Sequence, residues 1–325
     1  MEFELKKVGL IDEAKIEISE LTIIRGENNT GKTYVTYALY GFLRSWRQIL
    51  FIELRTKISE ALAESTSSQI NLQSIFNGQV NKYLDRFTKR YVRRLPEVFA
   101  SSPEFFSEAE VKMTIPAEID FLRNNYHQSI KDTTGTKTLA TVRKAKDSSI
   151  LEVLMADQAL EMTRYGLIDF VSYAIADIVF SPYLPNAFIA SSERTGAAIF
   201  RKDLDFARTR MVEAIGRLDS KDFRKNPFRL LEQMAAGYPM PVQDNVDFIR
   251  QIEDIEKQVS PLIEAHPKVL DAFEAVIGGT YKVVKGKGLY YQPKGAASHG
   301  CLCRSHPVRC VHCSILVSIC AAAPR

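Results

Sequence analysis

Cysteine is missing from the first three hundred residues of this chain: all five cysteines lie between Cys301 and Cys320. Such segregation indicates that the tail has a different history from the rest. A long, pure apolar run is also missing; the nearest candidate, residues 165–185, contains Asp169 and Asp177, so we expect no membrane span. The first residues carry charges before any long apolar run, which predicts no secretory signal and a cytoplasmic location.

A strong charge imbalance is absent too. The net charge of +4 is too small to imply a nucleic-acid partner. Nucleic-acid binding would have to be argued from local clusters of basic residues. The five histidines form no Ser/His/Asp or H-E-x-x-H arrangement, which gives no indication of a protease or metallohydrolase. The length of 325 residues, with 46% hydrophobic and 25% charged residues, indicates a globular protein of about two domains.

What is present is a phosphate-binding loop. Residues 26–33 read Gly-Glu-Asn-Asn-Thr-Gly-Lys-Thr and match G-x-x-x-x-G-K-[ST]. Residues 21–24 before them are apolar and β-branched, which predicts a buried strand, and residues 34–43 after them predict a buried helix. The alternative is a chance glycine turn that caps a helix.

The motif assigns a role to each of its residues. Its glycines let the backbone fold around an anion, so that successive N–H groups point at phosphates. Lys32 is expected to reach the β- and γ-phosphates of ATP, and Thr33 to offer its hydroxyl to Mg²⁺. The predicted nucleotide-binding residues are Gly26, Asn28, Asn29, Thr30, Gly31, Lys32 and Thr33.

Strand patterns occupy the ends of the chain and helical spacing occupies the middle. Residues 3–8 and 14–18 predict two strands, and residues 187–190 predict another buried strand. Helical spacing covers much of residues 44–125 and 148–180, with a polar hairpin or loop at 131–146 and a break at 181–186. Further helices are predicted at 198–215, 245–259 and 262–276, followed by a hairpin at 281–291.

The opening strands and the Glu-Asn-Asn form of the loop resemble the N-terminal lobe of ABC-type AAA ATPases. These are the heads of structural-maintenance-of-chromosomes proteins, recombination mediators and overcoming-lysogenization-defect nucleases. Residues 192–196, Ser-Glu-Arg-Thr-Gly, resemble a second feature of the defence-associated members. The resemblance implies an α/β P-loop NTPase head lobe with a large helical insertion, and head-to-head homodimers that sandwich ATP.

The catalytic half of that family pattern is not found. The family has a serine-rich signature and then four apolar residues followed by Asp-Glu, and neither follows residues 281–291. Residues 166–170 imitate the acidic segment but lack the second acid, so we interpret Asp169 as part of a core helix. Glu193 and Arg194 are weak catalytic candidates near Mg²⁺ or the γ-phosphate, and a structural ion pair explains them equally well.

Residues 82–94 mix basic and aromatic side chains within the predicted insertion. Phosphate contacts from this segment would suit an ATPase directed to nucleic acid. The alternative, which we favour, is an amphipathic helix whose aromatic residues lie in the core.

Three interpretations of the tail stay open. Residues 301–313 hold two close cysteine pairs with nearby histidines, a spacing that could ligate zinc. An ordinary terminal peptide is the second interpretation. The third, which we favour, is that everything after about Lys294 is a frame-shifted translation of the lost half of the ATPase.

These observations predict four segments: an ATPase lobe at 1–50, a helical insertion at 51–186, a return to the lobe at 187–294 and an atypical tail at 295–325. The predicted function is an ATP-binding head that couples nucleotide to a nuclease or other effector on nucleic acid, with hydrolysis impaired. The alternatives are a non-hydrolysing nucleotide-binding scaffold or truncated inactive product, and, ranked last, a small-molecule kinase.

Overall fold

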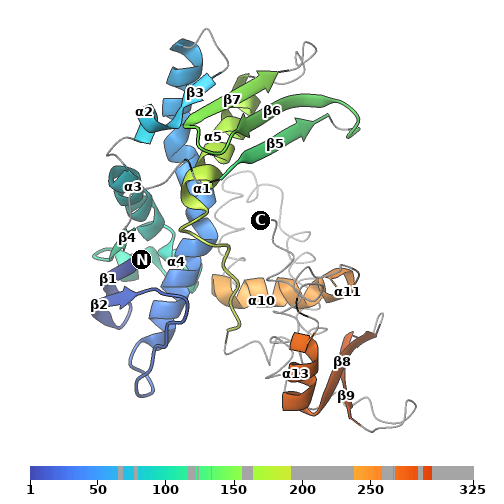
Figure 1. Ribbon diagram of the computed structural model, residues 1–325. Helices are drawn as coiled ribbons and strands as arrows, with labels where there is room; N and C mark the ends of the chain where they lie inside the picture. Colours follow the sequence, from blue (N-terminus) through green and yellow to red (C-terminus); the bar gives the residue numbers. More distant parts are fainter. Residues whose placement is uncertain are drawn as a thin grey trace, which may run out of the picture. The chain divides into compact units, whose positions relative to one another are not determined.

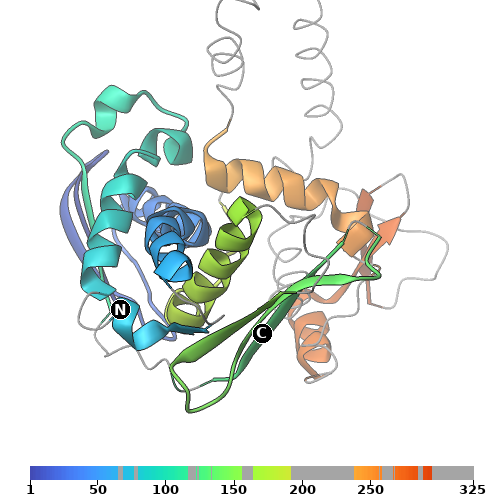
Figure 2. The ribbon, with the colours of Figure 1, turned by 90° about the horizontal axis from the view of Figure 1, so that it is seen from above.

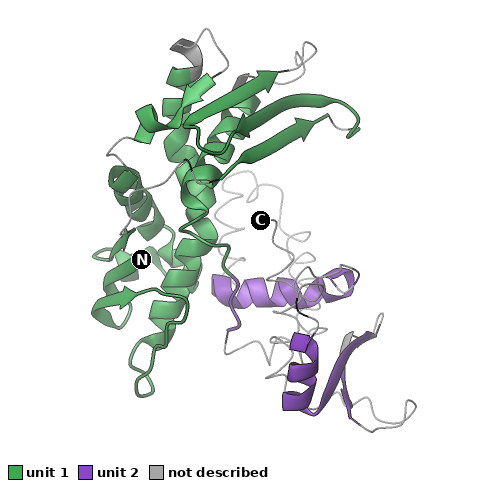
Figure 3. Ribbon diagram, in the orientation of Figure 1, with its two compact units in different colours: residues 1–187 green, residues 188–325 purple. Residues whose placement is uncertain are grey.

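The structure is a computed structural model that divides the chain into two compact units, Met1–Ala187 and Phe188–Arg325 (Figures 1 and 3). It describes residues 1–64, 69–76, 80–115, 122, 124–132, 134–155, 164–191, 238–255, 257, 266, 268–284 and 288–294. The first unit contains the loop of residues 26–33.

The first unit opens with a three-stranded antiparallel sheet. β1 (Glu2–Val8) pairs with β2 (Ile11–Glu17) on one side and with β4 (Glu110–Thr114) on the other. Phe3, Leu5 and Val8 of β1 are fully buried. Lys7 has a φ of 51°, and this left-handed residue shifts the alternation by one position, so that Val8 takes the core side.

A 33-residue helix, α1 (Lys32–Glu64), follows the loop and runs through the middle of the first unit. It lies between α3 (Val80–Val92) on one side and α5 (Arg164–Phe180) on the other (Figure 2). Because it is covered from two sides, apolar residues occur around most of its circumference, as expected for a central helix. Two ion pairs tie α1 to α5: Arg47 with Asp177 at 3.1 Å, and Arg55 with Asp169 at 3.0 Å.

A second, four-stranded antiparallel sheet also belongs to the first unit. Its order is β3 (Gln69–Asn71), β7 (Ile150–Met155), β6 (Thr138–Lys144) and β5 (Tyr126–Lys131). Ala140, Val142, Leu151 and Val153 form its buried face, and α5 contacts β5 and β6. Three short elements complete the unit: α2 (Leu72–Phe76), α4 (Leu95–Phe99) and the 3₁₀ helix η1 (Pro103–Phe106).

The second unit is described in part. It contains α10 (Met240–Arg250), α11 (Ile252–Ile255), α13 (Lys268–Ile277) and the antiparallel hairpin of β8 (Gly279–Val284) and β9 (Gly288–Pro293). Val246, Phe248 and Ile249 of α10 form a small core against Phe188.

Several predicted elements are confirmed. The opening hairpin, the helix after the loop, the hairpin within residues 131–146, the break after Phe180 and the hairpin of residues 281–291 all occur in the structure. The helices predicted at residues 245–259 and 262–276 are confirmed where the structure describes them, as α10, α11 and α13, while residues 258–265 lie outside the described residues. The predicted helix at 198–215 and the whole tail lie outside the described residues.

Other predicted elements are wrong. Residues 70–71 and 150–155 were expected in helices and form strands β3 and β7, so the middle of the chain is not all helical. The apolar run at 150–155 fits helical spacing, but its residues are paired with β6 and β3, and this tertiary pairing decides the outcome.

Both predicted buried strands are wrong as well. Residues 21–24 form no strand, and Leu21 and Ile23 are 77% and 78% exposed. Residues 187–190 form no strand either, because the Asn245 side chain takes the place of a neighbouring strand: Asn245 Nδ2 donates to the carbonyl oxygen of Ile189 at 2.6 Å, and Asn245 Oδ1 accepts from the Ser191 amide at 3.0 Å.

Candidate functional site

The loop of residues 26–33 folds back on itself, with its lysine across the turn. Lys32 Nζ donates a hydrogen bond to the carbonyl oxygen of Gly26 at 2.8 Å and another to that of Glu27. The Thr30 hydroxyl donates to the same Glu27 oxygen at 2.9 Å. The ammonium group therefore holds the start of the loop against the beginning of α1, and the segment is not extended.

Two left-handed residues shape this turn. Asn29 has a φ of 64° and Gly31 a φ of 84°, and both lie in the region that L-residues other than Asn and Asp rarely occupy. An added Cβ at Gly31 would also lie 2.4 Å from Cδ1 of Ile11, so the end of that side chain would have to shift. The glycine of the motif is required by the fold of the loop.

The β1–β2 hairpin positions the loop through these close contacts. Gly9, at the hairpin turn, has a φ of 60°, and a Cβ there would lie 2.0 Å from the Tyr34 ring. Tyr34 belongs to the first turn of α1 and stacks on Phe99 of α4 at 5.2 Å between ring centroids. The hairpin tip, the loop and the start of α1 therefore pack as one assembly.

The loop stands at the positive end of a long helix. The first intrahelical bond of α1 runs from the Val35 amide to the Gly31 carbonyl oxygen at 3.1 Å, so the amides of residues 32–34 have no helical acceptor four residues back. The first turn contains no acidic residue that would offset the helix dipole. These amides and Lys32 would stabilise an anion that binds at residues 31–34.

The predicted Mg²⁺ ligand is accessible. The Thr33 side chain is exposed, and its carbonyl oxygen accepts a hydrogen bond from the Thr36 hydroxyl at 3.1 Å. Within the described ranges, no hydrogen bond or ion pair joins an acidic side chain to Lys32 or Thr33. Lys32 and Thr33 have the chemistry to hold a triphosphate and its Mg²⁺, whose other ligands would include phosphate oxygens and water.

Of the other residues weighed in the sequence, the described part of the chain includes Asp169, which does not join the loop. Asp169 lies in α5 and pairs with Arg55 of α1, which fits the core-helix interpretation. Glu193 and Arg194 lie outside the described residues, as do the cysteines of the tail. In the described part of the chain, no three His, Cys, Asp or Glu side chains gather as a metal-binding group.

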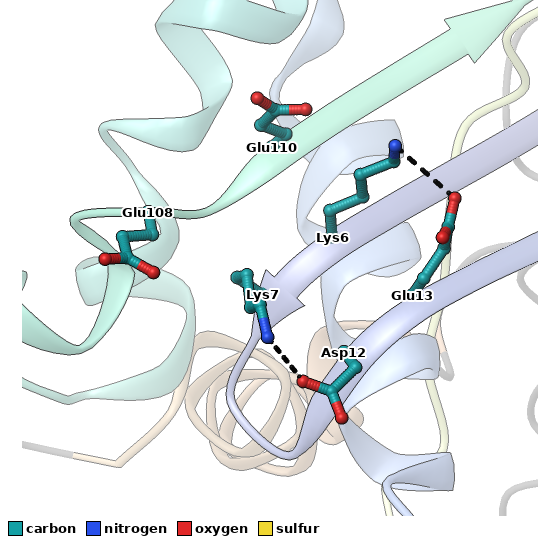
Figure 4. A pocket seen from close by; sticks show the side chains of 6 residues that line it. All are labelled: Lys6, Lys7, Asp12, Glu13, Glu108 and Glu110. Carbon is teal, nitrogen blue, oxygen red and sulfur yellow. Dashed lines mark hydrogen bonds and ion pairs between the residues drawn. The ribbon is translucent and has the colours of Figure 1, made fainter.

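A polar cluster that the sequence analysis missed lies on the three-stranded sheet. Lys6 pairs with Glu13 at 3.4 Å and Lys7 with Asp12 at 2.6 Å across β1 and β2, with Glu108 and Glu110 nearby (Figure 4). The hydrogen bond from Lys7 lowers the pKa of Asp12 and raises that of Lys7, so both groups hold their charge near neutral pH. The register of the predicted hairpin could have revealed these pairs, which are exposed and therefore contribute little to stability.

Comparison with protein-family models, curated proteins and solved structures found no match to this chain. Among the residues the structure describes, no helix has both the length and the apolar character needed to cross a membrane. The assignment of the loop therefore depends on its residues and their geometry.

Proposed function

We propose that residues 26–33 bind a nucleoside triphosphate, ATP in the first instance, together with Mg²⁺. The observation that carries the proposal is the position of Lys32, whose ammonium group lies over the Gly26 and Glu27 carbonyl oxygens at the start of α1. Phosphate oxygens are stronger acceptors for an ammonium group than neutral carbonyls are, so a triphosphate can replace these intramolecular bonds.

Each residue has a defined part in this binding. Gly31 admits the backbone close to the phosphates, the amides of residues 32–34 donate to them, and Lys32 neutralises charge on the β- and γ-groups. Thr33 supplies its hydroxyl to Mg²⁺, while Gly26, Asn28, Asn29 and Thr30 form the surrounding turn. Bound Mg²⁺ would neutralise the triphosphate and make the terminal phosphoryl group more electrophilic.

The wider function that we propose follows from the family resemblance. The chain would act as an ATPase head of the ABC-type AAA class, paired head to head, that controls a nuclease or other effector on nucleic acid. The competing proposal is a nucleotide-binding scaffold without turnover. It is favoured by the sequence after residues 281–291, which holds no acidic residue at all.

Calorimetry with Mg–ATP tests the binding site. We expect Lys32→Ala to weaken ATP binding at least about tenfold, since charge-assisted hydrogen bonds are worth roughly 1.5–3 kcal/mol. The matched control is Lys57→Ala, a lysine of the same helix that pairs with Glu60 and should leave affinity unchanged. Equal affinity of wild type and Lys32→Ala would refute the nucleotide assignment.

Phosphate release measured on the same proteins separates the two proposals. Turnover that disappears in Lys32→Ala supports an ATPase. ATP binding without phosphate release supports the scaffold.

A further inference from the structure

Four cations form one line along the outer face of α3. Lys82, Arg86 and Lys89 are exposed, and Arg93, the first residue after the helix, is exposed too. Their spacings of four, three and four residues keep them on one side of a helix. At 1.5 Å per residue, the line extends over roughly 16 Å. We call these four residues the α3 basic line.

The opposite face of α3 is anchored in the core. Tyr83, Phe87 and Tyr91 are buried, and the ring of Phe42 on α1 lies 4.4 Å from that of Phe87 and 5.4 Å from that of Tyr91. Both views of the ribbon place α3 beside α1, on the side away from α5 (Figures 1 and 2). The helix therefore cannot rotate its aromatic residues outward, and the α3 basic line is held facing outward.

Two neighbouring cations, Arg90 and Arg94, form ion pairs, whereas these four form none with the residues that the structure describes. Arg90 pairs with Glu53 of α1, and Arg94 pairs with Glu97 at 3.0 Å. Among described residues, no acidic side chain forms an ion pair with any member of the α3 basic line. Asp85 is the single acidic residue between positions 80 and 93, so the line carries a net excess of positive charge.

We propose that the α3 basic line binds the phosphate backbone of double-stranded nucleic acid. A row of fixed cations complements a regular array of phosphates, and backbone contacts of this kind are independent of sequence. Single-stranded binding uses exposed aromatic rings for base stacking, and the aromatic residues of α3 are buried. Insertion into a membrane surface needs exposed apolar side chains, which this face lacks for the same reason.

Fluorescence anisotropy with a labelled 30-base-pair DNA duplex, measured without nucleotide, tests this proposal on the full chain. Four neutralised phosphates give a slope of log K against log salt of about −3.6. We expect the variant K82Q/R86Q/K89Q/R93Q to lose at least tenfold in affinity at 50 mM salt and most of that slope. The matched control K6Q/K15Q/R143Q/K257Q removes the same charge from four cations that are paired with carboxylates, and should bind nearly as wild type does.

Both quadruple variants should keep the wild-type melting temperature, measured by circular dichroism. If the α3 variant melts at a lower temperature, duplex binding is compared for the single variants Arg86→Gln and Lys89→Gln instead. Equal weakening in both variants would overturn the proposal. So would tighter binding of the single strand, or binding of vesicles with 30% phosphatidylserine in place of the duplex. Lys32→Ala should leave duplex binding unchanged. The duplex proposal and the nucleotide proposal can therefore fail independently of each other.

Discussion

The hydroxyl of Tyr91 donates a hydrogen bond to the backbone carbonyl oxygen of Ala38 at 2.5 Å, across the buried contact between α3 and α1. This bond fixes the helix that carries the α3 basic line to the helix that begins at Lys32. Burial also raises the pKa of Tyr91, because the phenolate would be formed away from water.

Tyr91→Phe is expected to lower the free energy of unfolding by about 1 kcal/mol near neutral pH, the usual net value of a lost hydrogen bond. Since the folded-state pKa is raised above the unfolded value of 10.0, the neutral phenol stabilises the fold fully below pH 10. That contribution is lost as the pH rises further, when the unfolded chain ionises. Urea melts at pH 7.5, 9.5 and 10.5 measure the difference between the two proteins, and a constant difference across this range would contradict the assignment.

Gly41 of α1 allows this close packing. A Cβ at this position would lie 2.6 Å from Cγ2 of Val98 and 2.7 Å from Oη of Tyr91. In an exposed helix, Gly→Ala stabilises by roughly 0.5–1 kcal/mol because alanine has the higher helix propensity. A loss of stability at Gly41 would therefore indicate that the added methyl group clashes with its neighbours. We expect Gly41→Ala to destabilise by about 1–3 kcal/mol, measured by urea denaturation.

The double variant Gly41→Ala with Val98→Ala is the control for this interpretation. Val98→Ala removes both methyl groups that the new Cβ would meet. Adding Gly41→Ala to Val98→Ala should therefore lower the free energy of unfolding by less than Gly41→Ala does in the wild type. A stabilising Gly41→Ala single variant would show that α3 and α4 are not packed against α1 in this way.

Gly31→Ala is expected to disrupt the loop with little effect on the rest of the fold. The change introduces a side chain at a φ of 84°, so backbone strain opposes the observed turn, and the Cδ1 methyl of Ile11, 2.4 Å from the new Cβ, must shift. ATP affinity should fall at least about tenfold in calorimetry while the melting temperature changes by only a few degrees.

Gly135→Ala serves as the control for Gly31→Ala, because Gly135 has a φ of 73° with nothing within 4 Å of its added Cβ. It carries the same kind of strain on a hairpin turn away from the loop. Equal ATP affinities of the two glycine variants would show that the turn at Gly31 has no part in binding.

Asp169→Asn tests whether the Asp169 carboxylate has a structural role or is a Mg²⁺ ligand. Asp169 pairs with Arg55 between two helices, with both side chains about two fifths exposed, so its loss should cost at most about 1 kcal/mol of stability. ATP affinity with Mg²⁺ is expected to stay at the wild-type value. A marked loss of Mg²⁺-dependent binding, with ATP binding in EDTA unchanged, would place Asp169 at the nucleotide instead.

Local sequence was sufficient to predict elements whose pattern is repeated at short range. The alternation in residues 3–8, the hairpin of residues 281–291 and the helix after Lys32 all follow from periodicity and turn residues. The motif also predicted a turn that needs glycine, and Gly31 has a φ of 84° there, while nucleotide binding by Lys32 stays a prediction. Periodicity also predicted that the aromatic residues of α3 face the core.

Elements that depend on a distant partner could not be predicted in this way. Residues 150–155 fit a helix until β6 and β3 pair with them, and residues 187–190 resemble a strand, yet the Ile189 carbonyl accepts its hydrogen bond from the Asn245 side chain. Residues 21–24 have strand propensity, yet propensity alone forms no strand without a neighbour for its backbone groups.

The sequence by itself therefore determined the turn before α1, the opening hairpin and the amphipathic pattern of α3. Only the tertiary structure decided which cations form no ion pair within the described residues, since Arg90 pairs with Glu53 of α1 while Lys82, Arg86 and Lys89 face outward. The physical reason is range: backbone conformation and periodicity act over a few residues, whereas charge pairing and strand pairing require segments that folding brings together from far apart in the chain.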